Sequence, residues 1–390
     1  MTHIPYGRQD IRQDDIDAVV AVLRSDWLTQ GPTVPRFERA LSDYCGARHA
    51  VAVNSGTSAL HIACLALGLG PGDWLWTSPN TFLASAYAGF YCGANVDLVD
   101  VDLATGNMSV DALTEKLERA DKIGRLPKIV MPVHFAGLSC DMELIGALAG
   151  RYGFRVVEDA AHAVGGRYLD KPVGNCRYSD VTVFSFHPVK VVTTAEGGAV
   201  LTNDVELAER MMRLRSHGTT RDPKRMIGQP DGPWSYEALE VGWNYRMTDL
   251  QAALGYSQMQ RLDGYVRRRA ELAERYDWLL ANTGVALPGR NAKAASAWHL
   301  YAIGWNESKS GLSRRHAFDH LRAAEIGVQV HYIPLHTQPV FRAKGFASGQ
   351  FPNAETHYRR AITLPLYASL TDAEQDRVAS ALKMKASVMQ

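Results

Sequence analysis

The segment FSFHPVKVVTTAEGG (184–198) places one lysine, Lys190, in a loop between two apolar stretches, VTVFSF (181–186) and GAVLTN (198–203). Short apolar runs that are rich in valine and bounded by turn residues are typical of buried strands. Most lysines lie at the protein surface, but Lys190 has apolar neighbours in a loop rich in Ser, Thr and Gly. Because a desolvated lysine has a lowered pKa, it can form a Schiff base with a carbonyl compound. Lys190 is therefore the first candidate catalytic residue.

Upstream of this segment, apolar strand candidates alternate with helical stretches from residue 49 to about residue 217. Such alternation indicates a layer of helices on a largely parallel sheet. Together with the two stretches beside Lys190, it predicts an α/β large domain with a mainly parallel seven-stranded sheet between helices. The upstream strand candidates are HAVAVN (49–54), WLWTS (74–78), VDLVDVD (96–102), PKIVMPVHF (127–135) and FRVVED (154–159).

The remainder of the chain predicts a second, smaller domain. Thr248 and Gln251 form a T-x-x-Q capping box, which opens a helix that we expect to reach Leu280 with a break near Gly264. Strands are expected near 297–304 and 327–333, which makes this part α+β. We therefore divide the chain into a large domain, 1–250, with a helix near 14–24 before its first strand, and a small C-terminal domain, 251–390.

The composition excludes several classes of partner. With 42 basic and 41 acidic residues, the net charge is +1, which gives no reason to expect nucleic acid or an anionic membrane as partner. The N-terminus lacks a signal pattern, and no apolar run approaches the roughly 20 residues that span a bilayer. The five cysteines are scattered and form no C-x-x-C, which fits reduced thiols and disfavours a zinc cage. We expect a cytoplasmic protein.

A candidate phosphate site follows the first strand, in the sequence NSGTSA (54–59). Free backbone N–H groups and the positive dipole end at a helix N-terminus attract phosphate. Gly56 lets the backbone approach closely, Thr57 and Ser58 add hydroxyl donors, and Ser185 is placed to add another. A plain helix N-cap remains an alternative, because Ser and Thr are common there.

Acidic and imidazole side chains stand at the end of a predicted buried strand, in EDAAH (158–162). A carboxylate at the carboxyl edge of an α/β sheet points into the crevice where ligands bind. Asp159 could keep a pyridine nitrogen protonated, and His162 could hydrogen-bond a neighbouring ring substituent. A metal site or a structural Asp–His pair is the alternative, but the sequence has no H-E-x-x-H or comparable zinc spacing.

Taken together, these three segments resemble the DegT/DnrJ/EryC1/StrS group of sugar aminotransferases, a branch of the fold-type I enzymes that use pyridoxal 5′-phosphate (PLP). The resemblance covers nearly the whole chain and implies that fold, with PLP as the cofactor and no metal. It rests on PYGRQDI (5–11), DWLTQGPTVPRFE (26–38), NSGTSALH (54–61), TSPNTFLAS (77–85), EDAAHAVGG (158–166), FSFHPVKVVTTAEGG (184–198), GWNYRMTDLQAALG (242–255) and VQVHYIPLH (328–336).

The resemblance implies roles for individual residues around the cofactor. Lys190 matches the Schiff-base lysine, and Asp159 matches the carboxylate on the pyridinium nitrogen. His162 matches the residue beside the ring hydroxyl. Phe82 matches the aromatic on the ring face, although by itself it is more typical of core packing. Gly56, Thr57, Ser58 and Ser185 match the phosphate cradle.

The resemblance also implies a homodimer with shared active sites and a nucleotide-sugar site. Asn244 matches an amide that reaches the phosphate from the partner subunit. The segments that line the sugar-nucleotide site match Tyr6, Asp26, Trp27, Leu28, Thr29, Gln329, Val330, His331 and Tyr332.

The phrases SFHPVK, RSHGTTRDP and QVHYIPLHTQP are most similar to the subgroup of the pseudaminic acid pathway. This implies transfer of an amino group from L-glutamate to UDP-2-acetamido-2,6-dideoxy-β-L-arabino-hexos-4-ulose, giving UDP-4-amino-4,6-dideoxy-N-acetyl-β-L-altrosamine. Another keto sugar nucleotide, aminated at C3 or C4, remains an alternative. So does a non-catalytic binding or regulatory protein on the same fold. A sugar dehydratase is disfavoured, because such relatives lack the lysine that Lys190 matches.

Overall fold

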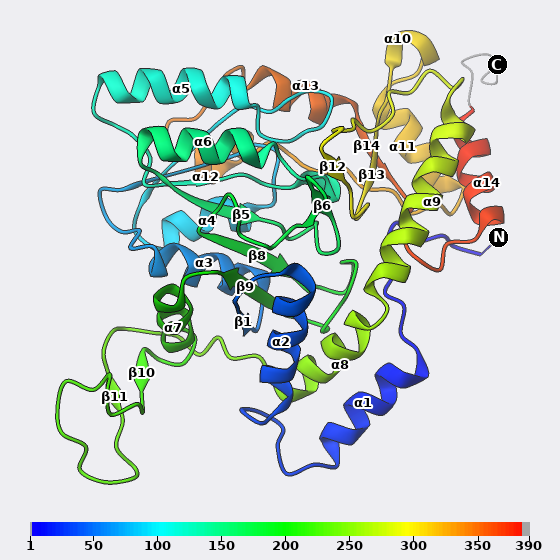
Figure 1. Ribbon diagram of the computed structural model, residues 1–390. Coiled ribbons are helices and arrows are strands. Elements are labelled where there is room, and N and C mark those ends of the chain that lie inside the picture. Colours follow the sequence, from blue (N-terminus) through cyan, green and yellow to red (C-terminus); the bar gives the residue numbers. More distant parts are fainter. Residues whose placement is uncertain (1, 384–390) are drawn as a thin grey trace.

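The computed structural model describes residues 2–383, and its centre is a seven-stranded sheet in the order β1-β9-β8-β5-β4-β2-β3 (Figure 1). Neighbouring strands run parallel from β8 to β3, whereas β9 is antiparallel to both β1 and β8. The predicted, mainly parallel α/β sheet is therefore confirmed. The strands are β1 (His49–Val53), β2 (Trp74–Thr77), β3 (Asn95–Leu98), β4 (Ile129–Met131), β5 (Arg155–Asp159), β8 (Val181–Ser185) and β9 (Gly198–Thr202).

Helices cover both faces of the sheet (Figure 1). Successive side chains in a strand point to opposite faces, so Val51 and Val53 of β1 pack on one side and Ala50 and Ala52 on the other. Burial of both faces accounts for the almost continuously apolar strands. The first face packs on α3 (Gly56–Ala66), α4 (Leu83–Tyr91) and α7 (Val205–Leu214); the second packs on α2 (Thr33–Cys45), α5 (Val110–Lys122), α6 (Met142–Tyr152) and α8 (Asp249–Met259).

The C-terminal part has a core of its own, in which helices pack on an antiparallel pair of strands. The side chain of Tyr265 still belongs to the large-domain core, whereas Leu272 and later residues of the same helix belong to the small one. The division near residue 250 stays a prediction, and the change of core falls inside α9. The elements of this core are α9 (Leu262–Leu280), α11 (Arg314–Ala323), α14 (Asp372–Leu382), β13 (Tyr301–Gly304) and β14 (Ala361–Leu364).

Two expected features of this part lie elsewhere in the structure. Thr248 and Gln251 form the predicted capping box of α8, but the break before α9 falls at residues 260–261, not near Gly264. Gly264 is tolerated inside α9, since a helix-interior glycine costs only about 1 kcal/mol. The expected strand at 327–333 does not form. Its backbone bonds are divided between Ile4 on one side and Thr363 on the other, so no ladder develops, and β14 pairs with β13 instead.

The amino-terminal residues are held by the small domain. Ile4 is 1% exposed and forms a parallel bridge with Ile326. The Gly327 N–H donates to Ile4 O at 2.7 Å, and a Cβ at Gly327 would come within 2.8 Å of the Tyr6 nitrogen, so only glycine permits this approach. The Leu366 N–H donates to Tyr6 O at 3.1 Å. Tyr6 is thereby fixed from residues more than 300 positions away in the chain.

The segment around β10 (Thr219–Thr220) and β11 (Glu237–Ala238) projects away from the sheet (Figure 1). Ile227, Trp234 and Val241 in or beside it are exposed. Within residues 2–383, no helix has the length and apolar character needed to cross a membrane. The remaining elements are α1 (Gln13–Leu23), α10 (Glu307–Ser310), α12 (Pro339–Arg342), α13 (Pro352–Arg360), β6 (Arg167–Tyr168), β7 (Lys171–Pro172), β12 (Ala294–Ala295), η1 (Phe135–Gly137) and η2 (Leu335–Thr337).

Candidate active site

A cavity of about 440 Å³ opens at the carboxyl ends of the parallel strands β4, β5 and β8. Ligands of open α/β sheets bind at this edge, because the loops that follow the strands converge there. The cavity brings together ten of the residues predicted from the sequence. They are Tyr6, Gly56, Thr57, Phe82, Asp159, His162, Ser185, Lys190, His331 and Tyr332.

Lys190 reaches the cavity from the loop between β8 and β9, as its position between two buried strands predicts. A turn closed by the Lys190 N–H to His187 O bond, at 2.9 Å, fixes its backbone. Burial lowers the pKa of Lys190 to about 8, although the nearby charge of Asp159 acts in the opposite direction. Among the residues described, Lys190 forms no ion pair. A larger fraction of this amine than of an ordinary lysine is therefore neutral and nucleophilic near neutral pH.

Asp159 is the last residue of β5 and is held on both sides of its backbone. Its N–H donates to Pro132 O at 2.9 Å, and its carbonyl accepts from the His134 N–H at 3.0 Å. Its carboxylate accepts from the Ser85 hydroxyl at 2.6 Å and from the Ala161 N–H at 3.1 Å. Asp159 is 4% exposed, so its negative charge faces the cavity from a fixed and nearly dry position.

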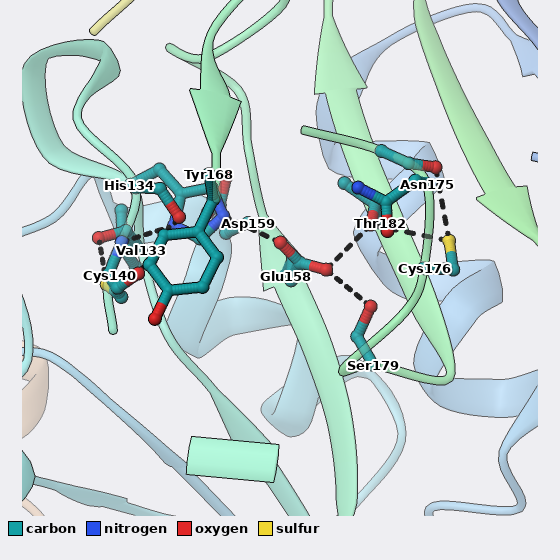
Figure 2. A network of polar contacts seen from close by, with 12 residues as sticks. Val133, His134, Cys140, Glu158, Asp159, Tyr168, Asn175, Cys176, Ser179 and Thr182 are labelled. Carbon is teal, nitrogen blue, oxygen red and sulfur yellow. Dashed lines mark hydrogen bonds and ion pairs between the residues drawn. The ribbon is translucent and has the colours of Figure 1, made fainter. Parts of the chain in front are cut away.

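Glu158 lies beside Asp159 in the strand but points to the opposite face of the sheet, into the network that Figure 2 shows. It accepts hydrogen bonds from His134 Nε2 at 2.8 Å, from Thr182 Oγ1 at 3.1 Å and from the Ser179 hydroxyl. His134 Nδ1 accepts from the Cys140 N–H, so the imidazole proton lies on Nε2. Burial raises the pKa of Glu158, but the donors outweigh burial and hold it below its usual value. The network joins β5 and β8 to the segment that follows β4.

His162 is neutral and its tautomer follows from its partners. Its Nδ1 accepts from the Ala136 N–H at 3.3 Å, so the proton lies on Nε2 and points to Tyr332 Oη at 3.1 Å. Burial lowers the pKa of His162 well below its usual value, and the charge of Lys190 acts in the same direction. Burial also raises the pKa of Tyr332. The pair thus presents neutral hydrogen-bonding groups to the cavity.

The N-terminus of α3 and the end of β8 form a narrow cradle. A Cβ at Gly56 would meet Ser185 Cβ at 2.9 Å and Oγ at 3.0 Å, so only glycine keeps the two backbones this close. Thr57 and Ser185 line the cavity there. Ser58 does not, because its hydroxyl donates to Asn54 Oδ1 at 2.7 Å within the helix cap. The N-cap of α3 is Ser55, so capping and phosphate binding are compatible in this segment.

This arrangement fits PLP. A half-buried amine of lowered pKa suits the aldehyde, a fixed carboxylate suits the ring nitrogen, and the glycine-containing helix N-terminus suits the phosphate. Phe82, with its ring 60% exposed, supplies an aromatic face to the same cavity. Among residues 2–383, no cluster of three or more His, Cys, Asp or Glu side chains is arranged to hold a metal ion.

The other predicted site residues lie outside this cavity in the single chain. Asp26, Trp27, Leu28 and Thr29 form an exposed loop after α1, where Thr29 pairs with Thr248. Asn244 is exposed and pairs through its backbone with Ser216. Gln329 pairs with Thr363, and Val330 follows it without lining the cavity. The roles expected of Ser58, Asp26, Trp27, Leu28, Thr29, Asn244, Gln329 and Val330 stay predictions.

Sequence reasoning missed several polar residues of the cavity, among them Ser85 and His299. Ser85 lies in the first turn of α4 and donates to Asp159. His299 lies just before β13, with its ring 4.5 Å from that of His162. Each is a single polar residue in a stretch of mostly apolar residues that is typical of a buried helix or strand. The local sequence therefore does not distinguish it from a residue of the core. Only the fold brings these side chains to the cavity.

The structure is similar to solved sugar aminotransferases. PseC of Helicobacter pylori, an aminotransferase involved in the biosynthesis of pseudoaminic acid, is 30% identical, with a TM-score of 0.89 and 98% of each chain covered. The PLP form of Spr1654 from Streptococcus pneumoniae, a putative sugar aminotransferase, is 30% identical, with a TM-score of 0.87 and 98% of each chain covered.

The sequence points to the same family. The spore coat polysaccharide biosynthesis protein SpsC of Bacillus subtilis (strain 168) is 39% identical over 383 residues, which cover 97% of this chain and 96% of SpsC. The model of the DegT/DnrJ/EryC1/StrS aminotransferase family matches residues 9–383. The chain therefore belongs to the DegT/DnrJ/EryC1/StrS family and is a PLP-dependent sugar aminotransferase.

Proposed function

We propose that the protein transfers the amino group of L-glutamate to a UDP-linked 4-keto-6-deoxy sugar. The proposed acceptor is UDP-2-acetamido-2,6-dideoxy-β-L-arabino-hexos-4-ulose, and the product is UDP-4-amino-4,6-dideoxy-N-acetyl-β-L-altrosamine. The observation that carries the proposal is the cavity itself, in which Lys190 and Asp159 face an open volume of about 440 Å³. Similarity to PseC, an aminotransferase involved in the biosynthesis of pseudoaminic acid, supports this choice of sugar.

Each of the side chains that line the cavity has its own role in the proposed reaction. When bound, PLP supplies the electron sink that lets an amino group move between carbon atoms. Lys190 Nζ, neutral in part at its lowered pKa of about 8, takes a proton from one carbon and returns it to another. The anionic Asp159 holds the proton of the ring nitrogen by charge pairing. The cradle at Gly56, Thr57 and Ser185 binds the phosphate.

We also propose a homodimer in which each active site borrows from the partner subunit. The segment from β10 to Asn244 is long and carries exposed apolar side chains. Such side chains favour contact with another protein surface, because that contact removes them from water. Loops of this length without much regular structure are uncommon unless they are functional. Asn244 lies outside its own cavity, which agrees with a role in the partner's. A two-fold axis would place the two segments symmetrically.

A second candidate acceptor is a keto sugar nucleotide used for a surface polysaccharide. The specific observation in its favour is the 39% identity to SpsC, a spore coat polysaccharide biosynthesis protein. Both candidates use the same cofactor and the same lysine. They differ in the sugar that the cavity accepts, which includes the position of the keto group, C3 or C4.

The experiment is a product analysis with a panel of nucleotide keto sugars. Purified PLP-loaded protein is incubated with L-glutamate and UDP- or dTDP-linked 3-keto and 4-keto sugars, and products are identified by mass spectrometry and NMR. Lys190→Ala is expected to give no aminated product, and Lys190→Arg is not expected to rescue it, because arginine stays protonated. Lys171→Ala, an exposed lysine on β7, is the matched control.

Amination of the proposed UDP sugar with the highest kcat/KM in the panel supports the first candidate. A preference for a different keto sugar contradicts it and supports the second. Product formation by Lys190→Ala at the wild-type rate would contradict both candidates, since each requires this amine.

A further inference from the structure

Asp159 receives a side-chain hydrogen bond from a residue of another element. The Ser85 hydroxyl lies 2.6 Å from Asp159 Oδ2, and 74 positions of sequence separate the two residues. Asp159 ends β5, whereas Ser85 lies in the first turn of α4. The bond therefore fixes the end of a strand to the start of a helix across the floor of the cavity.

A second hydroxyl stands behind the first. Thr81 Oγ1 lies 2.7 Å from Ser85 Oγ, a distance at which either hydroxyl can be the donor. Counting protons settles the direction. An ionised carboxylate only accepts, and the other acceptor within reach of the Ser85 hydroxyl, Phe82 O, is farther away, at 3.4 Å. Ser85 therefore gives its single proton to Asp159, and Thr81 donates to Ser85. The relay runs from Thr81 through Ser85 to Asp159.

The relay is almost completely shielded from water. Thr81 is 3% exposed, Ser85 is 1% exposed and Asp159 is 4% exposed. In such surroundings hydrogen bonds are stronger than in water, and donors in series polarise one another. The Ala161 N–H occupies the other carboxylate oxygen at 3.1 Å. Each oxygen of Asp159 thus has a donor of its own, and the carboxylate cannot rotate without losing both.

The position of Ser85 in α4 also favours the negative charge of Asp159. Ser85 lies at the N-terminal end of α4, where the helix dipole is positive and stabilises a nearby negative charge. Phe82, the N-cap, makes no side-chain cap hydrogen bond there. Thr81 and Ser85 are four residues apart, and both hydroxyls are used by the relay. Their residue types are therefore explained by Asp159 and not by capping.

We propose that Ser85 and Thr81 are positioning residues that orient the Asp159 carboxylate toward the ring nitrogen of PLP and keep that nitrogen protonated. This inference rests on the proposed role of Asp159. A carboxylate with both oxygens fixed keeps its free lone pairs directed into the cavity, where they meet the N–H of the ring. Without the Ser85 hydroxyl the carboxylate loses one of its two donors and turns away from that direction.

The test uses PLP labelled with nitrogen-15 in the ring, reconstituted into the full-length protein. The nitrogen-15 chemical shift reports directly whether the ring nitrogen carries a proton, and equilibrium dialysis gives the Kd of PLP. The test variant is Ser85→Ala, and Ser85→Thr restores the hydroxyl. Ser42→Ala is the matched control, a buried serine on α2 whose hydroxyl bonds only Arg39 O. Asp159→Asn is the reference for loss of the charge.

Ser85→Ala is expected to move the shift toward the unprotonated value and to weaken PLP binding about tenfold, the effect of losing one hydrogen bond to a charged group. Ser85→Thr and Ser42→Ala are expected to match the wild type. Thr81→Val, which has nearly the same shape, is expected to give a smaller change in the same direction. It also keeps the test valid if Ser85→Ala does not fold.

Failure of the relay and failure of the proposed role of Asp159 give different results. If Asp159→Asn moves the nitrogen-15 shift but neither Ser85→Ala nor Thr81→Val does, the relay is overturned and the role of Asp159 stands. If Asp159→Asn leaves the shift at the wild-type value, Asp159 is not the ring partner, and the relay falls with it. Ser85→Ala could also lower the stability of the protein and leave both the nitrogen-15 shift and the Kd of PLP unchanged. That result would show that the Ser85–Asp159 bond has only a structural role, and it would overturn the proposal.

Discussion

Tyr332 Oη lies 3.1 Å from Nε2 of His162, and the two residues, both of which line the cavity, are 170 positions apart in the sequence. Because the Ala136 N–H occupies Nδ1, Tyr332 is the acceptor for the only N–H of this imidazole. The bond therefore joins the turn after β5 to the segment that precedes η2, inside the cavity.

Removal of this acceptor is expected to destabilise the protein. Tyr332→Phe leaves a buried imidazole N–H without a partner, so the free energy of unfolding should fall by about 1–3 kcal/mol, as measured by urea denaturation of the cofactor-free protein. Tyr87→Phe is the control, because the Tyr87 hydroxyl forms no hydrogen bond with any residue in the range 2–383. Equal losses for the two variants would contradict the importance of the bond.

The capture of PLP by the cofactor-free protein is expected to depend on pH through Lys190. Only the neutral amine attacks the aldehyde, and burial lowers the pKa of Lys190 to about 8. The capture rate should therefore rise as the pH increases through about 8 and level off above it, whereas an ordinary lysine would level off only above about 10. Stopped-flow absorbance between pH 6.5 and 10 measures this. A rate that still rises tenfold per pH unit at pH 9.5 would contradict the lowered pKa.

Glu158 is expected to make the folded state sensitive to acid. Its pKa is held below the usual value by His134, Ser179 and Thr182, so the folded state binds its proton less readily than the unfolded chain does. The stabilisation is present above about pH 4.5 and is lost as the pH falls through the lowered pKa. Glu158→Gln should lower the free energy of unfolding by about 1–3 kcal/mol at pH 7 and flatten its fall in acid.

The control for this prediction is Glu115→Gln on the surface of α5, which should change the free energy of unfolding by less than about 0.5 kcal/mol. Urea titrations from pH 3.5 to pH 7 compare the three proteins. If the wild type and Glu158→Gln lose stability in parallel as the pH falls, Glu158 does not carry the acid sensitivity.

Shared active sites are testable by complementation. Lys190→Ala and Asn244→Asp chains are each expected to be inactive, the second because its new charge repels the phosphate of PLP. Mixed dimers contain one site with both wild-type residues, so about half of the per-dimer activity of two wild-type sites should return. Activity is assayed after dissociation and reassociation, with mixed dimers verified by native mass spectrometry. Mixed dimers without activity would show that the sites are not shared through Asn244.

The sequence predicts those parts of the molecule whose interactions are local. The apolar strands, the capping box at Thr248 and the glycine-containing turn at Gly56 each carry their own pattern, and Lys190 is recognisable because its two flanking strands are apolar. The small domain is less predictable. Ala361–Leu364 pairs with β13, whereas Ile326 bridges to Ile4 and Gln329 bridges to Thr363. These partners are distant in the sequence, so no local window around either segment contains the pairing.

The polar floor of the cavity could not be predicted for the same reason. Ser85 is one serine among apolar helix residues, and its partner is 74 positions away. His299 is a buried histidine next to a strand, a position that core histidines also occupy. The side chains around Asp159 are selected by the packing of α4 and the small domain against β5, which is a tertiary property.

The hydrogen bonds from Gly327 to Ile4 and from Leu366 to Tyr6 have a consequence for the order in which the protein is completed during synthesis. The ribosome releases Ile4 and Tyr6 among the first residues, yet their partners emerge only after most of the polypeptide has been synthesised, because translation proceeds from the N-terminus. A nascent chain that ends before Glu325 already contains Lys190, Asp159 and the phosphate cradle, but one wall of its cavity is missing. Completion of the cavity is therefore a late event of biosynthesis, because the segment that carries His331 and Tyr332 is among the last parts of the chain to be made.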